Sequence, residues 1–363
     1  MKKKIISWLG FFPILAIGLT LLLISQRQPL FATWYATYIY PVFPRTIGWF
    51  WGLFPFSVFE ILFVLVILLF IVGMVYFILC LFKRERRVRL KARGLLFTRR
   101  LLYLLASIFT VFVLTAGINY SRESYAHYVG IVVQDSSLDE LIRLYMMLVE
   151  RADVLSQQIE VDDYGHFVLG RVGLYDYASL SMDELNNLYG GLGWYFPRAK
   201  APILSRLLLS NLNIGGFFSP WTLEAHYNGD MPATSIPFVI NHELAHVSGH
   251  MREDEANFIA YLASRNSQNV DFQYSAVYTA LNYILNALRR VVSSEEYSEL
   301  FAKLPEQVKR DFAYAWAYWQ TFQGPVADMQ VRINDAYLRL NQQEDGVQSY
   351  GRMVDLLLAY YRN

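Results

Sequence analysis

The sequence has 363 residues, of which 55% are hydrophobic, 16% aromatic and only 17% charged, proportions that are unusual for a soluble protein. Its single cysteine, Cys80, excludes a disulfide or a thiolate metal site within the chain. The net charge of +1 hides a division. Residues 1–118 carry 14 Lys/Arg against 2 Asp/Glu, whereas residues 119–363 carry 18 against 29. An acidic second part does not favour polyanionic partners, so no nucleic acid is expected.

Three apolar runs lie in the first part of the chain: Ile5–Ser25, Phe54–Phe82 and Leu101–Ile118. Each reaches the roughly 20 residues that a helix needs to cross a bilayer. The first run lacks a convincing small-residue cleavage site and further runs follow it, so we interpret it as an anchor and not a signal peptide. We therefore predict a membrane region over residues 1–118, with spans at about 5–25, 54–82 and 101–118, followed by a separate domain over 119–363.

Basic residues predict the orientation of these spans. The loop expected over 83–100 holds nine Lys/Arg and one Glu, and Lys2, Lys3 and Lys4 begin the chain. Under the positive-inside rule both segments lie in the cytoplasm. A multi-pass protein of the cell membrane results, with the lipid bilayer as its partner, a cytoplasmic N-terminus and an extracytoplasmic domain after residue 118.

The remaining patterns are mostly helical. Residues 26–53 are rich in aromatics and are expected to form an external loop at the headgroup level. Ser137 is expected to cap a helix that runs to about Ile159, and Ser181 a shorter one. Lone His127 and His166 are expected at the surface. Further helices are predicted over 272–292, 294–304, 305–322, 326–340 and 349–362. The predicted fold is mainly α.

A short stretch, Gly215–Asp230, alternates in a way that is typical of β-strands. One interpretation is a sheet edge that pairs with the backbone of an extended substrate; the other is an ordinary hairpin that covers the core. Glu224, His226 and Asn228 are candidates to point into a cleft beside this small β-sheet.

The chemistry is concentrated in the motif His242-Glu243-Leu244-Ala245-His246. Residues four apart share one face of a helix, so His242 and His246 can present two imidazole nitrogens to one metal ion. Glu243 then lies beside the ion, where a carboxylate can take a proton from a bound water. The residue types predict a Zn²⁺ site with Glu243 as its catalytic residue.

A catalytic zinc needs a third protein ligand. Gly249 can end the first helix, and a second helix is expected to begin with the acidic residues Glu253, Asp254 and Glu255. Glu253 and Glu255 are both candidates for the third ligand, and His226 is a rival. His250 is interpreted either as a helix-end residue or as a residue that supports a ligand.

The motif H-E-L-A-H with the later E-x-x-A-N resembles the zincin metallopeptidases that use a glutamate ligand. More closely, the chain resembles the domain-of-unknown-function 3810 family of bacterial membrane proteins, which is grouped with those peptidases. The matching stretches are Gly216–Phe218, Thr222–Ala225, His242–Ala263 and Tyr350–Asp355. The resemblance implies that His242, His246 and Glu253 bind zinc and that Glu243 is the general base. It departs from the peptidases in the short gap before Glu253, which keeps Glu255 open, and in Asn257, which replaces the usual aspartate.

We therefore expect a membrane-anchored, zinc-dependent metallopeptidase that hydrolyses peptide or protein substrates on the outer face of the membrane. The alternative is a non-catalytic zinc-binding sensor or assembly protein of the cell envelope. A transporter is disfavoured, since only Glu60 is charged within the spans. A peptidase also needs a donor for the oxyanion of its tetrahedral intermediate, and Tyr274, Tyr278, Tyr350 and Arg352 are candidates.

Overall fold

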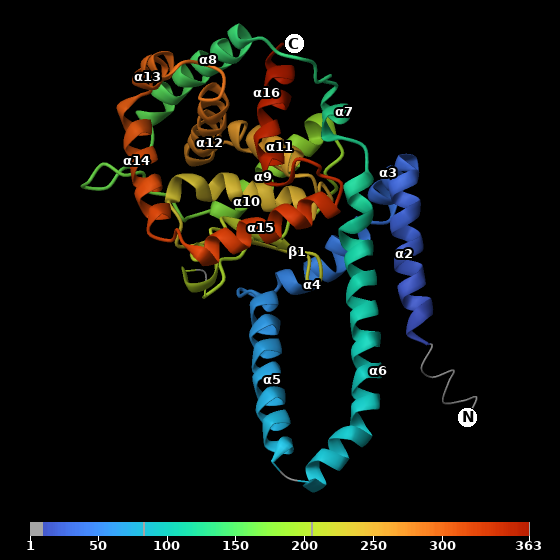
Figure 1. The fold of residues 1–363 in the computed structure, drawn as a ribbon. Coiled ribbons are helices and arrows are strands. Elements are labelled where there is room, and N and C mark those ends of the chain that lie inside the picture. The colour runs from blue at the N-terminus through green and yellow to red at the C-terminus, as the bar shows by residue number, and fades with distance from the viewer. Residues whose placement is uncertain (1–9, 83, 205, 363) are drawn as a thin grey trace.

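The computed structural model describes residues 10–82, 84–204 and 206–362 and shows a helical domain from which three long helices project on one side (Figure 1). These are α2 (Phe11–Arg27), α5 (Val58–Leu81) and α6 (Arg84–Thr115). Most of the described residues are helical, and the sheet that they form has two strands. The predicted mainly α fold with a small β-sheet is confirmed.

Two helices are long and apolar enough to cross a membrane, namely α5 and the segment Gly94–Thr115 of α6. Helix α2 reaches the length of a span only together with α3 (Pro29–Tyr38), and the two meet at a bend of 114°. The described residues thus contain two or three candidate spans, which makes membrane association plausible. Residues 5–9 of the first predicted span lie outside the described residues.

Two segments that were predicted as loops are helical. The basic stretch after Arg84 belongs to α6, because Arg, Leu, Lys and Ala all favour a helix and a lone Gly94 does not end it. Residues 26–53 form α3, a π-helical turn (Pro44–Gly48) and α4 (Trp49–Gly52). Part of this segment packs against the domain: Tyr40 is buried and its hydroxyl donates to the Val247 carbonyl at 3.0 Å.

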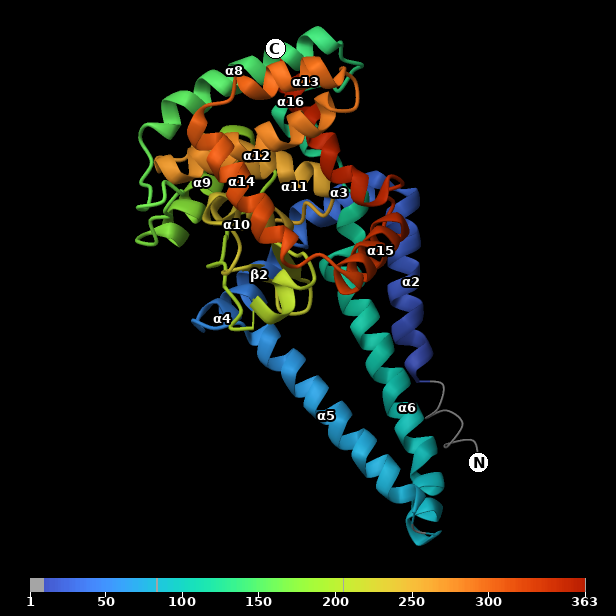
Figure 2. The same cartoon turned by 60° about the vertical axis from the view of Figure 1, so that its left-hand side comes forward.

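Helices α2 and α6 pack side by side, whereas α5 stands apart. Gly18 permits the close approach of the pair, since a Cβ there would lie 2.8 Å from Thr110 Oγ1. The same Thr110 hydroxyl donates to the Ile14 carbonyl at 2.9 Å. Helices α5 and α6 lie close together where the chain joins them and diverge toward the domain in both views (Figures 1 and 2).

The domain that follows α6 is built from helices and short helical turns. They are η2 (Gly117–Ser121), α7 (Tyr125–Val129), α8 (Leu138–Ser156), α9 (Leu174–Tyr189), η3 (Arg206–Ser210), η4 (Ala233–Ser235), α10 (Ile236–Val247), α11 (Glu253–Arg265), α12 (Val270–Leu288), α13 (Ser294–Ala302), α14 (Glu306–Gln320), α15 (Pro325–Leu340), η5 (Gly346–Arg352) and α16 (Met353–Arg362). Ser137 caps α8, as predicted, and it does so through a capping box with Glu140. The predicted cap at Ser181 is wrong, because α9 begins earlier, after Gly173, and Ser181 lies inside it and donates to Ala178.

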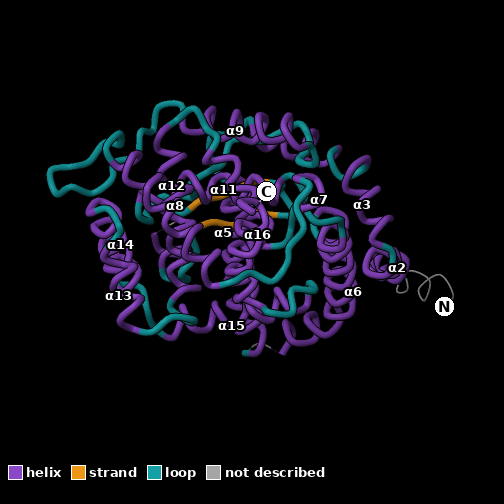
Figure 3. Tube along the Cα trace, turned by 90° about the horizontal axis from the view of Figure 1, so that it is seen from above, coloured by secondary structure: helices purple, strands orange, loops and turns teal. Residues whose placement is uncertain are grey.

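Strands β1 (Gly216–Ser219) and β2 (Glu224–Tyr227) are antiparallel, and Phe217 is the register partner of His226. The other side of β2 pairs with Lys200, so β1 is the edge of the sheet. Seen from above, the strands lie near the middle of the domain, and α2 and α6 lie at one side of it (Figure 3). Helices α10, α11 and α12 pack against one another and supply much of the buried core.

Candidate metal centre

Helix α10 carries the motif and is almost entirely buried. All of its residues except Val239 are buried, including His242, Glu243 and His246. Polar contacts fix the helix within the core: the Asn241 amide nitrogen donates to Ser181 at 3.1 Å and to Ser264 at 2.9 Å. The motif face therefore has a fixed position relative to the neighbouring helices.

A tight turn returns the chain from α10 to α11. Gly249 adopts a left-handed conformation (φ +89°), which glycine tolerates best, and its Cα packs close to Tyr40. Glu253 then opens α11, where its backbone N–H donates to Gln343 Oε1 at 3.1 Å. The first turn of α11 thus faces the histidines of α10, as the sequence predicts.

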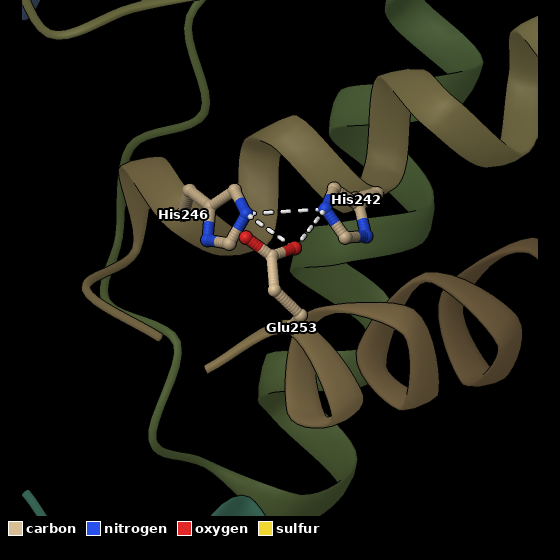
Figure 4. Close-up of side chains that lie close together, drawn as sticks. All are labelled: His242, His246 and Glu253. Atoms are coloured by element: carbon tan, nitrogen blue, oxygen red, sulfur yellow. Dashed lines mark hydrogen bonds and ion pairs between the residues drawn. The ribbon is translucent and has the colours of Figure 1, made fainter. Parts of the chain in front are cut away.

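His242, His246 and Glu253 converge on one point (Figure 4). Glu253 Oε2 lies 3.1 Å from His242 Nε2 and 3.5 Å from His246 Nε2, and the two Nε2 atoms are 3.1 Å apart. Tetrahedral zinc ligands at their usual bond lengths lie about 3.3 to 3.5 Å from one another. The three donors therefore have the spacing of three corners of one zinc tetrahedron.

Hydrogen bonds on the far side of each ring fix the tautomers. His246 Nδ1 lies 2.7 Å from the His250 carbonyl, which only accepts, so this nitrogen carries a proton. His242 Nδ1 lies 2.8 Å from Asn257 Oδ1. The orientation of that amide follows from its other end, because Asn257 Nδ2 donates to the Tyr350 carbonyl at 3.3 Å. In the neutral rings both Nε2 atoms consequently offer a lone pair to the shared point, as zinc requires.

Electrostatics favour a cation at the same point. Burial opposes a charge on His246, but the carboxylates of Glu253 and Glu243 raise its pKa to about 9. Burial likewise opposes a charge on Glu253, yet the two histidines hold the pKa of Glu253 well below its usual range. The local field of these carboxylates thus attracts positive charge, either a proton or a metal ion. The residue types and their geometry fit zinc.

Glu243 lies beside this donor set and against the sheet. It is 3% exposed, and burial raises the pKa of its carboxyl to about 8. Among the described residues its Oε2 has no hydrogen-bond partner. The other oxygen, Oε1, fits against the strand only because residue 216 is a glycine. A Cβ at Gly216 would lie 2.6 Å from Glu243 Oε1. A carboxyl with a raised pKa and an unpartnered oxygen is suited to receiving and returning a proton.

All four residues border a cavity of about 580 Å³. Its walls include β1 with Gly216 and Phe218, Ala116 and Tyr120 after the end of α6, and a set of aromatic and amide side chains from α12, α15 and η5. Tyr350 lines the cavity and its ring stacks on that of His242 at 6.5 Å. A space of this size is typical of a site for a small ligand or a peptide segment.

Other acidic and histidine candidates lie elsewhere. Glu255 faces away from the shared point, forming an ion pair with Arg252 and lying 3.5 Å from His250 Nδ1. His226 is fully buried next to Glu224, and its Nε2 lies 2.8 Å from Ser57 Oγ. Neither belongs to the group of three that could share an ion.

The lone histidines, and all but one of the candidate oxyanion donors, also lie away from the cavity. His127 is exposed and His166 half-buried, and each lies beside a carboxylate four residues earlier. Tyr274 and Tyr278 hydrogen-bond to Asp311 in the core, and Arg352 forms an ion pair with Asp345. Of these candidates only Tyr350 lines the cavity.

The sequence analysis did not identify Gly216 and Gln343 as residues that shape the site. Gly216 could have been found, because a glycine within a predicted strand can mark a close approach of another group. No sequence pattern points to Gln343.

Comparison with known families shows to which family the chain belongs. A family model described as a protein of unknown function, DUF3810, matches residues 35–358, which is most of the chain. The chain belongs to the DUF3810 family. No curated protein and no solved structure gives a match. The family match covers α5, α6 and the domain that follows them, whereas α2 lies before its first residue.

Proposed function

We propose that this DUF3810 protein is a membrane-anchored, zincin-like zinc metallopeptidase of the HExxH type. The observation that carries the proposal is the convergence of His242, His246 and Glu253 on one buried point, with Glu243 beside it. The two tautomers that direct both Nε2 lone pairs to that point support zinc in particular. A purely structural site has no need of Glu243, whose Oε2 has no hydrogen-bond partner among the described residues.

In this proposal each residue has one role. Zinc, when bound, acidifies a water and polarises the carbonyl of the scissile bond. Glu243 accepts the proton that the attacking water loses and returns it to the leaving amine. Tyr350 is the candidate donor to the oxyanion, because it borders the cavity beside His242.

Strand β1 supplies a place for the substrate backbone. Its partner β2 occupies one side, and no strand pairs with its other side among the described residues. Gly216 brings this edge against Glu243, so a peptide that adds to β1 would pass beside the proposed catalytic carboxylate. Main-chain hydrogen bonds at such an edge would hold an extended peptide regardless of its side chains.

The location of the reaction follows from the charge pattern. The basic segment over residues 83–100 and the N-terminal lysines belong in the cytoplasm under the positive-inside rule. The domain joins the opposite ends of α5 and α6 (Figure 1). We therefore place the metal centre on the outer face of the cell membrane.

The test compares two matched glutamate substitutions in the full-length protein. Glu243→Gln keeps the size of the side chain but removes its basicity, whereas Glu150→Gln makes the same change on the exposed face of α8. We expect Glu243→Gln to retain zinc and to lose at least about a hundredfold in kcat against a peptide library, and Glu150→Gln to match wild type. Undiminished hydrolysis by Glu243→Gln contradicts the proposed role. Absence of hydrolysis by zinc-loaded wild type favours a zinc-binding sensor or assembly protein instead.

A further inference from the structure

A second cavity, of about 190 Å³, lies where α5 meets the sheet. Its walls are apolar side chains from three places: Phe59 and Phe63 of α5, Phe217 of β1, and leucines on and around η3, including Leu208. Glu60 is the single ionisable residue in its walls, and its carboxylate already accepts from the Ile203 and Leu204 N–H groups at 2.8 and 2.7 Å. The pocket therefore suits hydrocarbon and disfavours polar groups.

Phe217 connects this pocket to the metal cavity, since it lines both. Successive residues of a strand point to opposite faces. Gly216 lies against Glu243, and Phe217 points the other way, where it stacks on His226 at 4.3 Å and meets Phe59 at 5.3 Å. A peptide extended along β1 has the same alternation, with one side chain toward the metal centre and the next toward the apolar pocket.

The pocket lies at the level of the membrane boundary. Phe59 and Phe63 belong to the first two turns of the candidate span α5. The turn between the strands reaches both spans: the Trp221 ring stacks on Phe59 at 6.3 Å, and its Nε1 donates to the Ile108 carbonyl of α6 at 3.4 Å. Ile108 lies seven residues before the end of α6, or about 10 Å along the helix axis. The tip of the hairpin thus lies between the spans and within their apolar length.

A short helical turn forms one wall of the pocket. Residues Arg206–Ser210 make this turn, which is π-helical. Leu208 and Leu209 of this turn both line the pocket.

We propose that this pocket is a substrate subsite that takes a large apolar side chain, such as leucine or phenylalanine, from an extended polypeptide at the membrane surface. The inference rests on the proposed peptidase function and names its substrate class: polypeptide segments that emerge from or lie on the bilayer. Specificity comes from the pocket, since the β1 edge binds backbone alone.

The test uses full-length protein in lipid nanodiscs and fluorogenic peptides that are identical except for Ala, Leu, Phe or Asp at one scanned position. Leu208→Trp fills the pocket, and Leu188→Trp makes the same change at an exposed position on α9. We expect one position at which Leu and Phe exceed Asp by at least about tenfold in kcat/KM. Leu208→Trp should abolish that preference, while Leu188→Trp matches wild type.

A binding measurement separates this inference from the proposed function. Anisotropy of the same labelled peptides on zinc-loaded Glu243→Gln reports selectivity without hydrolysis. Selective binding of Leu and Phe peptides that Leu208→Trp removes supports the subsite even if wild type hydrolyses nothing. Hydrolysis or binding without any apolar preference overturns it. The subsite is also overturned if Leu208→Trp loses co-purified phospholipid but keeps the peptide selectivity of wild type. That result would show that the pocket binds lipid. Leu212→Phe, which also narrows the pocket, repeats the test if Leu208→Trp lowers the melting temperature.

Discussion

Asn257 Oδ1 lies 2.8 Å from His242 Nδ1 and thereby fixes which nitrogen of that ring carries the proton. Replacing Asn257 with Leu removes this acceptor. We expect zinc affinity to fall by about 10- to 100-fold, the usual cost of losing a partner that orients a ligating histidine. Competition with a chromophoric chelator measures the affinity. Asn187→Leu, at an exposed position on α9, is the control and should match wild type. Equal affinity in Asn257→Leu would contradict the assigned tautomer.

Gly216 and Gly215 form a natural pair for testing the position of Glu243. A Cβ at Gly216 would lie 2.6 Å from both Glu243 Oε1 and Val239 Cγ1, whereas a Cβ at Gly215 makes ordinary contacts at 3.6 Å. We expect Gly216→Ala to displace the carboxylate and lower kcat at least about tenfold, because misplacement of a catalytic group by about 1 Å is that costly. Zinc content should stay unchanged. Gly215→Ala should retain activity, and equal losses in the two variants would argue against a specific clash with Glu243.

The site was largely predictable because its parts are close together in sequence. The spacing of His242 and His246 fixes a shared helix face, and Gly249 followed by acidic residues predicts the turn into α11. The sequence alone does not decide whether Glu253 or Glu255 is the third ligand. Both lie in the first turn of α11, where the direction of a side chain depends on the local fold. The ion pair of Glu255 with Arg252 and its contact with His250 explain its direction.

The less predictable features depend on contacts that are distant in sequence. Residues 26–53 look like an interfacial aromatic loop, yet Tyr40 is buried against Val247, which lies 207 positions later. Helix α2, the described part of the first predicted span, meets α3 at a bend of 114°. Local patterns carry no information on such pairs. Ser181 shows a related problem: a serine followed by Glu184 resembles a cap, but apolar residues on both sides continue the helix.

His226 should make stability depend on pH through a group outside the metal centre. Burial lowers its pKa from 6.5 to about 4, although nearby Glu224 opposes the shift; Lys200 adds to it, and Ser57 bonds to Nε2. An imidazole with a lowered folded-state pKa is neutral in the native protein, so its stability contribution is complete above pH 6.5 and is lost as pH falls toward about 4. The full shift corresponds to about 3 kcal/mol.

Substitution tests this sign. The free energy of unfolding of His226→Gln should fall less than that of wild type between about pH 7 and pH 4, since glutamine does not titrate. Thermal unfolding in detergent at a series of pH values gives the comparison. His127→Gln, at an exposed position, is the matched control and should follow the wild-type curve. Parallel curves for His226→Gln and wild type would show that His226 does not titrate in this way.

Zinc stoichiometry of the purified full-length protein tests the central claim most directly. The donor geometry predicts about one zinc per chain in wild type and Glu243→Gln, and almost none in His246→Ala or Glu253→Ala. Glu255→Ala, whose carboxylate lies outside the donor set, should retain the metal. A wild-type protein that binds no zinc, or a Glu253→Ala protein that keeps it while Glu255→Ala loses it, would contradict the assignment.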